Sequence, residues 1–328
     1  MTRIATVPET PAVLVGIDTE ADNQWSEAGR RQLQVTNAGL LPVLQARLAR
    51  FRIRPTYLVS YEMAAAEESA AVLRELARSG ACEIGAHLHP WSCPPLASEN
   101  GHDHRFPNQL DTPLLSRQLR ELTQVIEERL GVRPTTYRAG RWGLDARALP
   151  LLEALGYTVD TSVDPLLNET RKGGPLFAGA PSSPYRPDYA DVTRAGEARI
   201  LEVPVSSGTL PRLGKRLEAL YVRLPPLRYR GALKRLGLRP VWLRPSYTSL
   251  VEMKTFASLL GEAGTPCFNI AFHSSELLPG GSPYSPDQNS IDRLLDDLDR
   301  LLEHLTGPLS GVGRTFSEFA AAFGTRAA

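Results

Sequence analysis

The sequence predicts an α/β protein built around a parallel sheet. Short runs rich in Val, Ile and Leu alternate with segments of helical periodicity along most of the 328 residues, and polar residues follow directly after several of these runs. A strand–helix–strand repeat pairs its strands in parallel through right-handed crossovers. The length suits either one large domain or two smaller ones.

Seven segments have the character of strands. The first, 12–17, is a continuous apolar run of the kind found in strands buried on both faces. The others are short apolar or β-branched runs bounded by polar or turn-forming residues. In chain order, the predicted strands are 12–17, 54–60, 84–88, 134–138, 157–162, 198–205 and 267–272.

Six segments between and after these strands have apolar residues at helical spacing. Gly80, Gly131 and Gly156 directly follow three of them, as is common at helix C-termini. The predicted helices are 38–51, 64–79, 114–130, 146–155, 253–264 and 289–304.

Polar side chains gather at the ends of the predicted strands. Because the carboxyl ends of parallel strands share one rim, we expect these side chains to converge on one site. Three of these residues have structural alternatives: Arg138 could pair with a helix end, Asp160 could be a turn acid, and His273 could be a buried core histidine. The residues concerned are Asp18, Glu20, His87, His89, Arg138, Asp160 and His273.

Two pairs of these residues have the spacing of neighbours on one strand face. His87 and His89 are two residues apart, as are Asp18 and Glu20, and such residues point to the same side. Imidazole is the commonest protein ligand for a divalent metal, and two adjacent carboxylates are costly unless a cation or a proton lies between them. The alternatives are a capped strand end and an acidic turn.

Together these residues include the ligand, base and acid side chains that a metal-dependent hydrolase needs. Such a site needs three protein ligands and an open position for water, and Glu20, His87 and His89 supply the three. Asp18 is placed to act as the base that takes a proton from water, and His273 as the acid that protonates the leaving group. The metal expected from these ligands is divalent, with zinc favoured.

Five short motifs resemble those of the polysaccharide deacetylases, carbohydrate esterase family four. They run in the family's order from about residue 13 to residue 276. Two longer stretches, 87–91 and 273–284, also resemble the subgroup that accompanies bacterial surface-polysaccharide genes. The motifs are Asp18-x-Glu20, the strand 83–87 ending in His87, Tyr137-Arg138, Asp160-x-Ser162 and the strand ending in His273.

The resemblance implies a distorted (β/α) barrel, as a single domain over residues 1–328, that removes acetyl groups from sugars with a divalent metal. It implies that Arg138 orients the base Asp18 and that Asp160 orients the acid His273. The sequence departs from the family pattern in three places. Glu20 stands where most members have Asp, Trp91 stands where the second histidine is usual, and the Pro of the third motif is missing. His89, His102 or His104 would then complete the ligands.

Composition limits the other classes of function. The net charge is +1, which gives no indication of a nucleic-acid or an acidic partner, and we expect no nucleic-acid partner. The three cysteines are too few for a disulfide framework. The first eleven residues lack the charged-then-apolar run of a secretion signal. We therefore expect a cytoplasmic location, with no prediction of the oligomeric state.

The segment 207–250 is expected to be a basic insert in the barrel. Residues 212–244 contain ten basic residues and one acid, a local net charge of +9. Leu213, Leu217, Leu220 and Leu224 fall on one helical face, which is typical of a basic amphipathic helix. A solvated lid is one interpretation. The other is peripheral contact with an anionic membrane or a lipid-linked sugar phosphate.

The sequence therefore predicts a metal-dependent deacetylase that removes an N-acetyl or O-acetyl group from a saccharide. The resemblance adds a setting in bacterial surface-polysaccharide assembly. Two alternatives remain open: an inactive protein of the same fold that binds a glycan or a partner, and a glycoside hydrolase on a related barrel that uses Asp18 and Asp160 as its acid pair.

Overall fold

The computed structural model describes residues 10–96, 104–224, 233, 235 and 237–324. Its centre is a parallel sheet in the order β10-β1-β2-β3-β4-β5-β6, with β9 also pairing with β1. The strands of this sheet are β1 Ala12–Thr19, β2 Thr56–Val59, β3 Glu83–Leu88, β4 Thr136–Ala139, β5 Val159–Asp160, β6 Leu201–Glu202, β9 Cys267–His273 and β10 Val312–Gly313.

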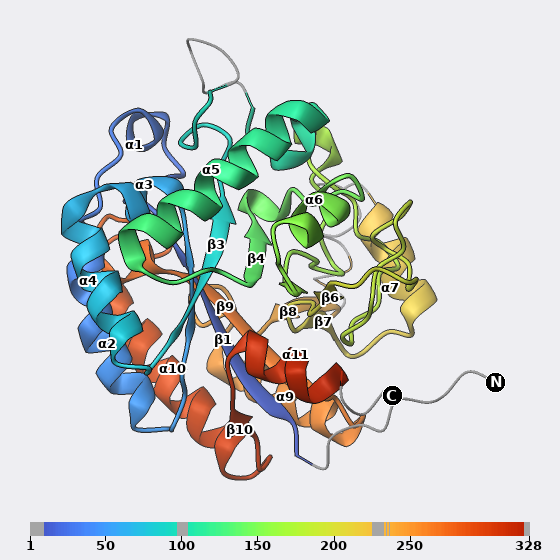
Figure 1. Ribbon diagram of the computed structural model, residues 1–328. Coiled ribbons are helices and arrows are strands. Elements are labelled where there is room, and N and C mark those ends of the chain that lie inside the picture. Colours follow the sequence, from blue (N-terminus) through green and yellow to red (C-terminus); the bar gives the residue numbers. More distant parts are fainter. Residues whose placement is uncertain (1–9, 97–103, 225–232, 234, 236, 325–328) are drawn as a thin grey trace.

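The sheet, in which β1 is a central strand, curls into an incomplete barrel (Figure 1). This confirms the predicted distorted barrel. Strand β9 pairs with β1 over Ala12 to Asp18, while β10 pairs with the start of β1 and β2 with its end. A separate antiparallel pair, β7 Ser207–Leu210 and β8 Arg239–Trp242, lies in the segment predicted to be a basic insert.

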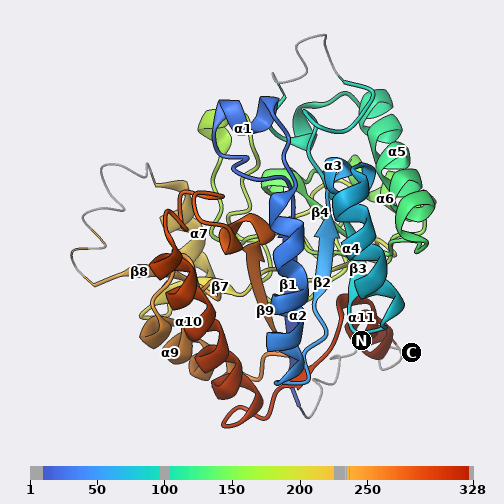
Figure 2. The same ribbon diagram turned by 90° about the vertical axis from the view of Figure 1, so that its left-hand side faces the viewer.

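Helices cover the outer face of the curled sheet. Figure 2 shows α2, α4 and α10 along this face, and Arg47 of α2 forms an ion pair with Asp299 of α10 at 3.0 Å. The helices are α1 Glu27–Arg31, α2 Leu41–Ala49, α3 Tyr61–Ala65, α4 Glu67–Arg78, α5 Thr112–Leu130, α6 Ala148–Ala154, α7 Lys215–Arg223, α9 Leu250–Glu262, α10 Gln288–Thr306 and α11 Phe316–Gly324.

Side chains alternate strictly between the two faces of β1. Val13, Val15 and Ile17 join the large core beneath the outer helices. Ala12 and Leu14 face inward and pack with residues of α11 at one end of the barrel. Because neighbours two residues apart share a face, the inward face of β1 continues into Asp18 at the opposite end.

The same alternation holds in the neighbouring strands. In β3, Ile84, Ala86 and Leu88 belong to the outer core, which leaves His87 on the inward face. In β9, Phe268, Ile270 and Phe272 are outward, which leaves His273 inward. The buried apolar residues therefore fix the direction in which the polar residues at the strand ends point.

Several predicted elements differ in extent from those observed. The helix predicted over 38–51 is a 3₁₀ turn, Thr36–Leu40, followed by α2, and the helix predicted over 64–79 is broken at Ala66 into α3 and α4. The fifth and sixth strands are each two residues long. Helix α11 and strand β10 were not predicted; α11 fills the inner end of the barrel with Phe316 and Phe319.

Only part of the basic segment 212–244 can be described, because residues 225–232, 234 and 236 lie outside the described chain. Helix α7 covers its start. Its buried residues are Tyr221 and Val222, whereas Leu217 and Leu220 are each 56% exposed. Leu213 and Leu224, from the same predicted face, are half-buried, so only the middle of this face lies toward solvent. Membrane contact through it stays a prediction.

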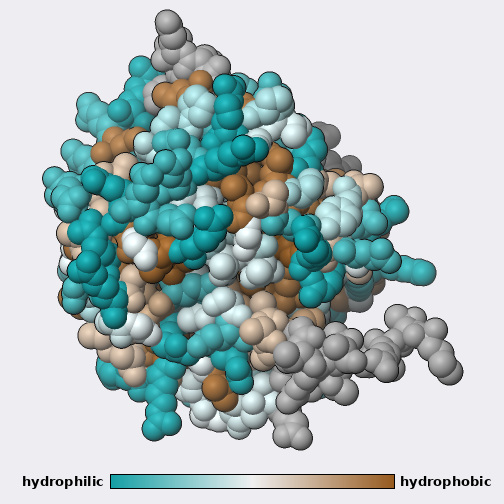
Figure 3. Space-filling model, viewed as in Figure 1, coloured by the Kyte–Doolittle hydropathy of each residue, from teal (hydrophilic) through white to brown (hydrophobic). Residues whose placement is uncertain are grey.

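On the face shown in Figure 3, hydrophilic residues cover much of the surface and hydrophobic residues form patches between them. Among the helices of the described residues, none has the length and apolar character needed to cross a membrane.

Candidate active site

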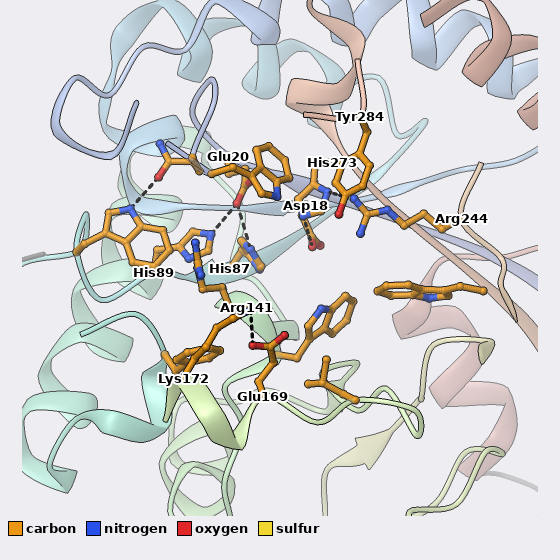
Figure 4. A pocket seen from close by; sticks show the side chains of 17 residues that line it. Asp18, Glu20, His87, His89, Arg141, Glu169, Lys172, Arg244, His273 and Tyr284 are labelled. Carbon is orange, nitrogen blue, oxygen red and sulfur yellow. Dashed lines mark hydrogen bonds and ion pairs between the residues drawn. The ribbon is translucent and has the colours of Figure 1, made fainter. Parts of the chain in front are cut away.

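A pocket opens at the carboxyl ends of β1, β3 and β9. Asp18, Glu20, His87, His89 and His273 all line it, so the convergence expected from the sequence is present for these five. Figure 4 shows their side chains pointing toward a common space. All four tryptophans of the chain also line the pocket: Trp25, Trp91, Trp142 and Trp242.

Glu20, His87 and His89 form a buried cluster at the base of this pocket. Nε2 of His89 lies 2.6 Å from Oε2 of Glu20, and Nε2 of His87 lies 3.7 Å from the same oxygen. One ligand atom from each residue lies within 4.8 Å of the others, and each residue is 2–3% exposed. Two imidazole nitrogens and a carboxylate oxygen facing one point could hold a divalent metal.

The other nitrogen of His87 fixes its orientation. Nδ1 of His87 lies 3.0 Å from the backbone carbonyl oxygen of Arg138, so its N–H donates a hydrogen bond to that oxygen. Nε2 is left facing Glu20 and is the nitrogen through which His87 could bind a metal ion. His89 stacks on Trp91 with ring centroids 4.1 Å apart, and the indole of Trp91 donates to Oε1 of Gln24 at 2.7 Å.

With Trp91 in place of the usual second histidine, His89 provides the third candidate ligand. Trp91 does not offer a ligand but supports the ring of His89, which takes the place beside Glu20. His104 does not line the pocket, and His102 lies outside the described residues.

Asp18 and Arg138 form a buried ion pair beside the cluster. Nη1 of Arg138 donates to Oδ1 of Asp18 at 2.6 Å, which is the pairing that the resemblance implies. Gly16 makes room for it, because a Cβ at that position would lie 2.7 Å from Nη2 of Arg138. The other carboxylate oxygen of Asp18 lies 3.6 Å from Nε2 of His273. The two groups predicted to be base and acid are therefore adjacent.

Charge in the site keeps both carboxylates ionised. Burial by itself would raise the pKa of Asp18, but the positive charge of Arg138 and the nearby His87 and His273 hold it below its ordinary value. For Glu20, burial is likewise outweighed by His273 and by hydrogen bonds from His87 and His89, so its pKa falls well below the usual range.

The partner of His273 differs from the one implied by the resemblance. Glu276, three residues later on a 3₁₀ turn, places Oε1 2.8 Å from Nδ1 of His273, and Arg244 forms an ion pair with the same Glu276 oxygen. With Nδ1 donating to Glu276, Nε2 of His273 faces the pocket and Asp18. The role of orienting this histidine thus belongs to Glu276.

Asp160 instead forms a buried pair with Glu202 on the neighbouring strand, and both side chains are fully buried. Ser162 donates to Oδ1 of Asp160 at 2.5 Å, and the backbone N–H of Val163 donates to Oε1 of Glu202 at 3.0 Å. Within the described residues, Oδ2 of Asp160 and Oε2 of Glu202 have no donor, and burial raises the pKa of both carboxyl groups, so we expect a proton shared between them. Asp160 does not line the pocket, which removes it as half of a glycosidase acid pair.

Glu202→Gln is expected to change the pH dependence of stability. Burial, and next the charge of Asp160, raise the pKa of Glu202 well above its ordinary value. Between the unfolded and folded pKa values, the folded state holds a proton that the unfolded state has lost, so stability falls as pH rises, by about 1.4 kcal/mol per pH unit. In the variant an amide hydrogen replaces that proton, so its melting temperature should exceed that of the wild type by a margin that grows from pH 5 to pH 8.

Glu303→Gln, on the exposed face of α10, is the control for this measurement. Its thermal unfolding curves should shift with pH in parallel with those of the wild type. Parallel behaviour of Glu202→Gln would show that no proton is shared in the pair.

Three residues that interact with predicted site residues lay beyond the sequence reasoning. Glu276 had a usable signal, since His273-x-x-Glu276 is a helical spacing that brings the two side chains together on one turn. Arg244 and Glu202 had none: Arg244 reaches Glu276 from a segment about thirty residues earlier, and Glu202 reaches Asp160 through the pairing of β5 with β6.

No protein-family profile matches the chain, and no curated protein matches it in sequence. Solved structures do match. A candidate polysaccharide deacetylase from Mycobacterium smegmatis superimposes with a TM-score of 0.60 over 99% of this chain and 95% of its own, at 16% identity. The fold is that of the polysaccharide deacetylases.

A candidate glycoside hydrolase or deacetylase from Parabacteroides distasonis superimposes with a TM-score of 0.63 over 98% of this chain and 73% of its own, at 14% identity. At such identities the deacetylase fold is the shared feature. The subgroup of surface-polysaccharide proteins is not resolved by these matches.

Proposed function

We propose that this protein is a metal-dependent deacetylase that hydrolyses an acetyl group on a saccharide. The observation that carries the proposal is the position of the Glu20–His87–His89 cluster beside the adjacent Asp18 and His273, in one pocket of a deacetylase fold. Two imidazoles and a carboxylate suit zinc, which we propose as the metal.

The proposed roles follow from charge and geometry. A divalent cation held by the cluster would polarise the acetyl carbonyl and lower the pKa of water beside it. Asp18, kept ionised by Arg138, takes the proton of the attacking water. Nε2 of His273 gives a proton to the departing nitrogen or oxygen of the sugar. The C–N or C–O bond to the acetyl carbon breaks, a C–O bond to water forms, and acetate leaves.

Glu276 and Arg244 support the acid. Glu276 accepts a hydrogen bond from Nδ1 of His273 and so holds the ring with Nε2, the nitrogen that would give the proton, toward the pocket. Arg244 pairs with Glu276 and keeps that carboxylate ionised, since burial alone would raise the pKa of Glu276 but Arg244 and His273 lower it.

Aromatic side chains suit the walls of the pocket to a sugar ring. Trp142 and Trp242 lie with ring centroids 5.4 Å apart, and Trp25 meets His273 edge-on at 4.9 Å. Flat apolar rings beside a few polar groups are the usual lining of a site for a ligand with both apolar and polar faces. We propose an acetylated saccharide as the ligand, in the cytoplasm; whether it is lipid-linked stays a prediction.

Acetate release from acetylated oligosaccharides tests the proposal. The zinc-loaded protein should release acetate from N- or O-acetylated oligosaccharides while producing no new reducing ends. New reducing ends without acetate would indicate a glycoside hydrolase. Purified protein that contains no metal by elemental analysis, and that releases neither product when zinc is supplied, would indicate an inactive binding protein.

A further inference from the structure

Among the described residues, one cation in the pocket has no acidic partner. Arg141 lines the pocket on the turn that follows β4. Within the part of the chain that the structure describes, its guanidinium makes no ion pair or hydrogen bond. A cation held in a half-buried site without a counter-ion is unfavourable, so its position requires a reason.

The other charged residues of the pocket are paired. Lys172 lies 2.8 Å from Glu169, and Arg244 is joined to Glu276. Glu20 faces its two histidines, and Asp18 accepts from Arg138. Each carboxylate in the described pocket therefore pairs with another group, and none forms an ion pair with Arg141.

The backbone at Arg141 is held in an unfavourable conformation. Arg141 and Trp142 both have left-handed backbone angles, with φ of 53° and 63°. Residues with a side chain seldom adopt these angles, and two in succession persist only where the surroundings enforce them. Gly140 anchors the turn, because a Cβ there would lie 2.3 Å from the carbonyl oxygen of Leu88. Strained turns of this kind cluster at functional sites.

Aromatic rings hold the guanidinium in place. The Cζ atom of Arg141 lies 5.4 Å from the ring centroid of Trp91 and 6.0 Å from that of Phe106. A guanidinium supported on aromatic faces keeps its N–H groups available in its own plane, where they match the two oxygens of a carboxylate or phosphate.

Charged groups of both signs surround Arg141. Figure 4 shows it between the cluster of Glu20 and the two histidines on one side and the Lys172–Glu169 pair on the other. Burial lowers the pKa of Arg141; the carboxylates of Glu20 and Glu169 raise it in part, but the positive charges of Arg30 and Arg105 lower it further. An anionic group of a ligand at the guanidinium would offset the repulsion from these two arginines.

We propose that Arg141 binds an oxyanion substituent of the substrate, so that the acetylated saccharide is an acidic one. The planar fork of the guanidinium fits a sugar carboxylate or a sugar phosphate, which share this chemistry. That the ligand is a substrate rests on the proposed function. The anion-binding site itself is defined by Arg141, Trp91 and Phe106.

Tryptophan fluorescence is a direct readout, because all four tryptophans line the pocket. The zinc-loaded protein is titrated at constant ionic strength with sodium glucuronate, with inorganic phosphate and with neutral N-acetylglucosamine. For Arg141→Gln we expect the Kd of the better anion to rise about 10-fold or more, as for loss of a charge-assisted hydrogen bond, and the Kd of the neutral sugar to change less than about 2-fold. Glucuronate binding tighter than phosphate assigns the substituent as a carboxylate, and the reverse order assigns a phosphate.

Two further variants complete the design. Arg141→Lys keeps the charge but loses the planar fork, and should give an intermediate Kd. Arg194→Gln removes an exposed arginine that pairs with Asp191 and does not line the pocket, and this variant should bind both anions as the wild type does. Circular dichroism verifies that each variant is folded, and Arg141→Lys replaces Arg141→Gln as the test if the latter unfolds.

An unchanged Kd for both anions in Arg141→Gln would overturn the inference, and so would an equal loss of binding for anions and neutral sugar. Failure of the proposed function is a separate outcome. In that case acetate is never released, yet the anion still binds through Arg141.

Discussion

Asp18→Asn is expected to lose turnover while keeping the metal. The amide cannot accept the proton of water, and loss of a general base typically costs about 10²- to 10⁴-fold in rate. Its oxygen can still accept from Arg138, so the buried guanidinium keeps a partner. The measurement is acetate release per bound ion, with zinc determined by elemental analysis.

Asp296→Asn is the control for this substitution, because Asp296 lies on the exposed surface of α10 with 76% of its side chain accessible. It should release acetate at the wild-type rate. If Asp18→Asn keeps both its ion and its rate, Asp18 is not the base. If it loses the ion, Asp18 belongs to the ligand set.

His87→Ala is expected to lose both metal and activity. The substitution removes one of three ligands whose atoms lie within 4.8 Å of one another. Since loss of even a supporting partner costs about 10- to 100-fold in metal affinity, loss of a ligand should cost at least about 100-fold. Elemental analysis of dialysed protein and the rate of acetate release are measured together, and a chelator should have the same effect on the wild type.

His304→Ala provides the matched control, because His304 lies on α10 and contacts Ser258 rather than the pocket. It should retain one ion and the full rate, and zinc should restore activity to the chelated wild type. Full zinc content in dialysed His87→Ala would show that the ion binds elsewhere.

Much of the site could be predicted from the strand ends. Alternation along β1 and β3 fixes which residues face inward, because the outward ones are apolar and must join the core beneath the helices. Glu20 and His89 lie just past those strands and keep the same spacing. The convergence of Glu20, His87 and His89 follows from the adjacent positions of β1, β2 and β3 in one parallel sheet.

The partner of His273 could not be predicted in the same way. The resemblance assigned that role to Asp160, but Asp160 lies beside Glu202 through the pairing of β5 with β6. Which of two buried acids reaches a given histidine depends on the strand register and on the turn after β9, and both involve segments distant from one another in the chain.

The sequence alone predicted the α/β class, the parallel pairing of the strands and the shared face of the candidate metal ligands, because these follow from periodicity, which is a local property of the chain. Tertiary structure decided the pairing of Glu276 with His273, the burial of Asp160 beside Glu202, and the position of Arg141, which has no ion pair among the described residues. These depend on which side chains meet across the barrel, and such contacts arise only when distant segments pack against one another.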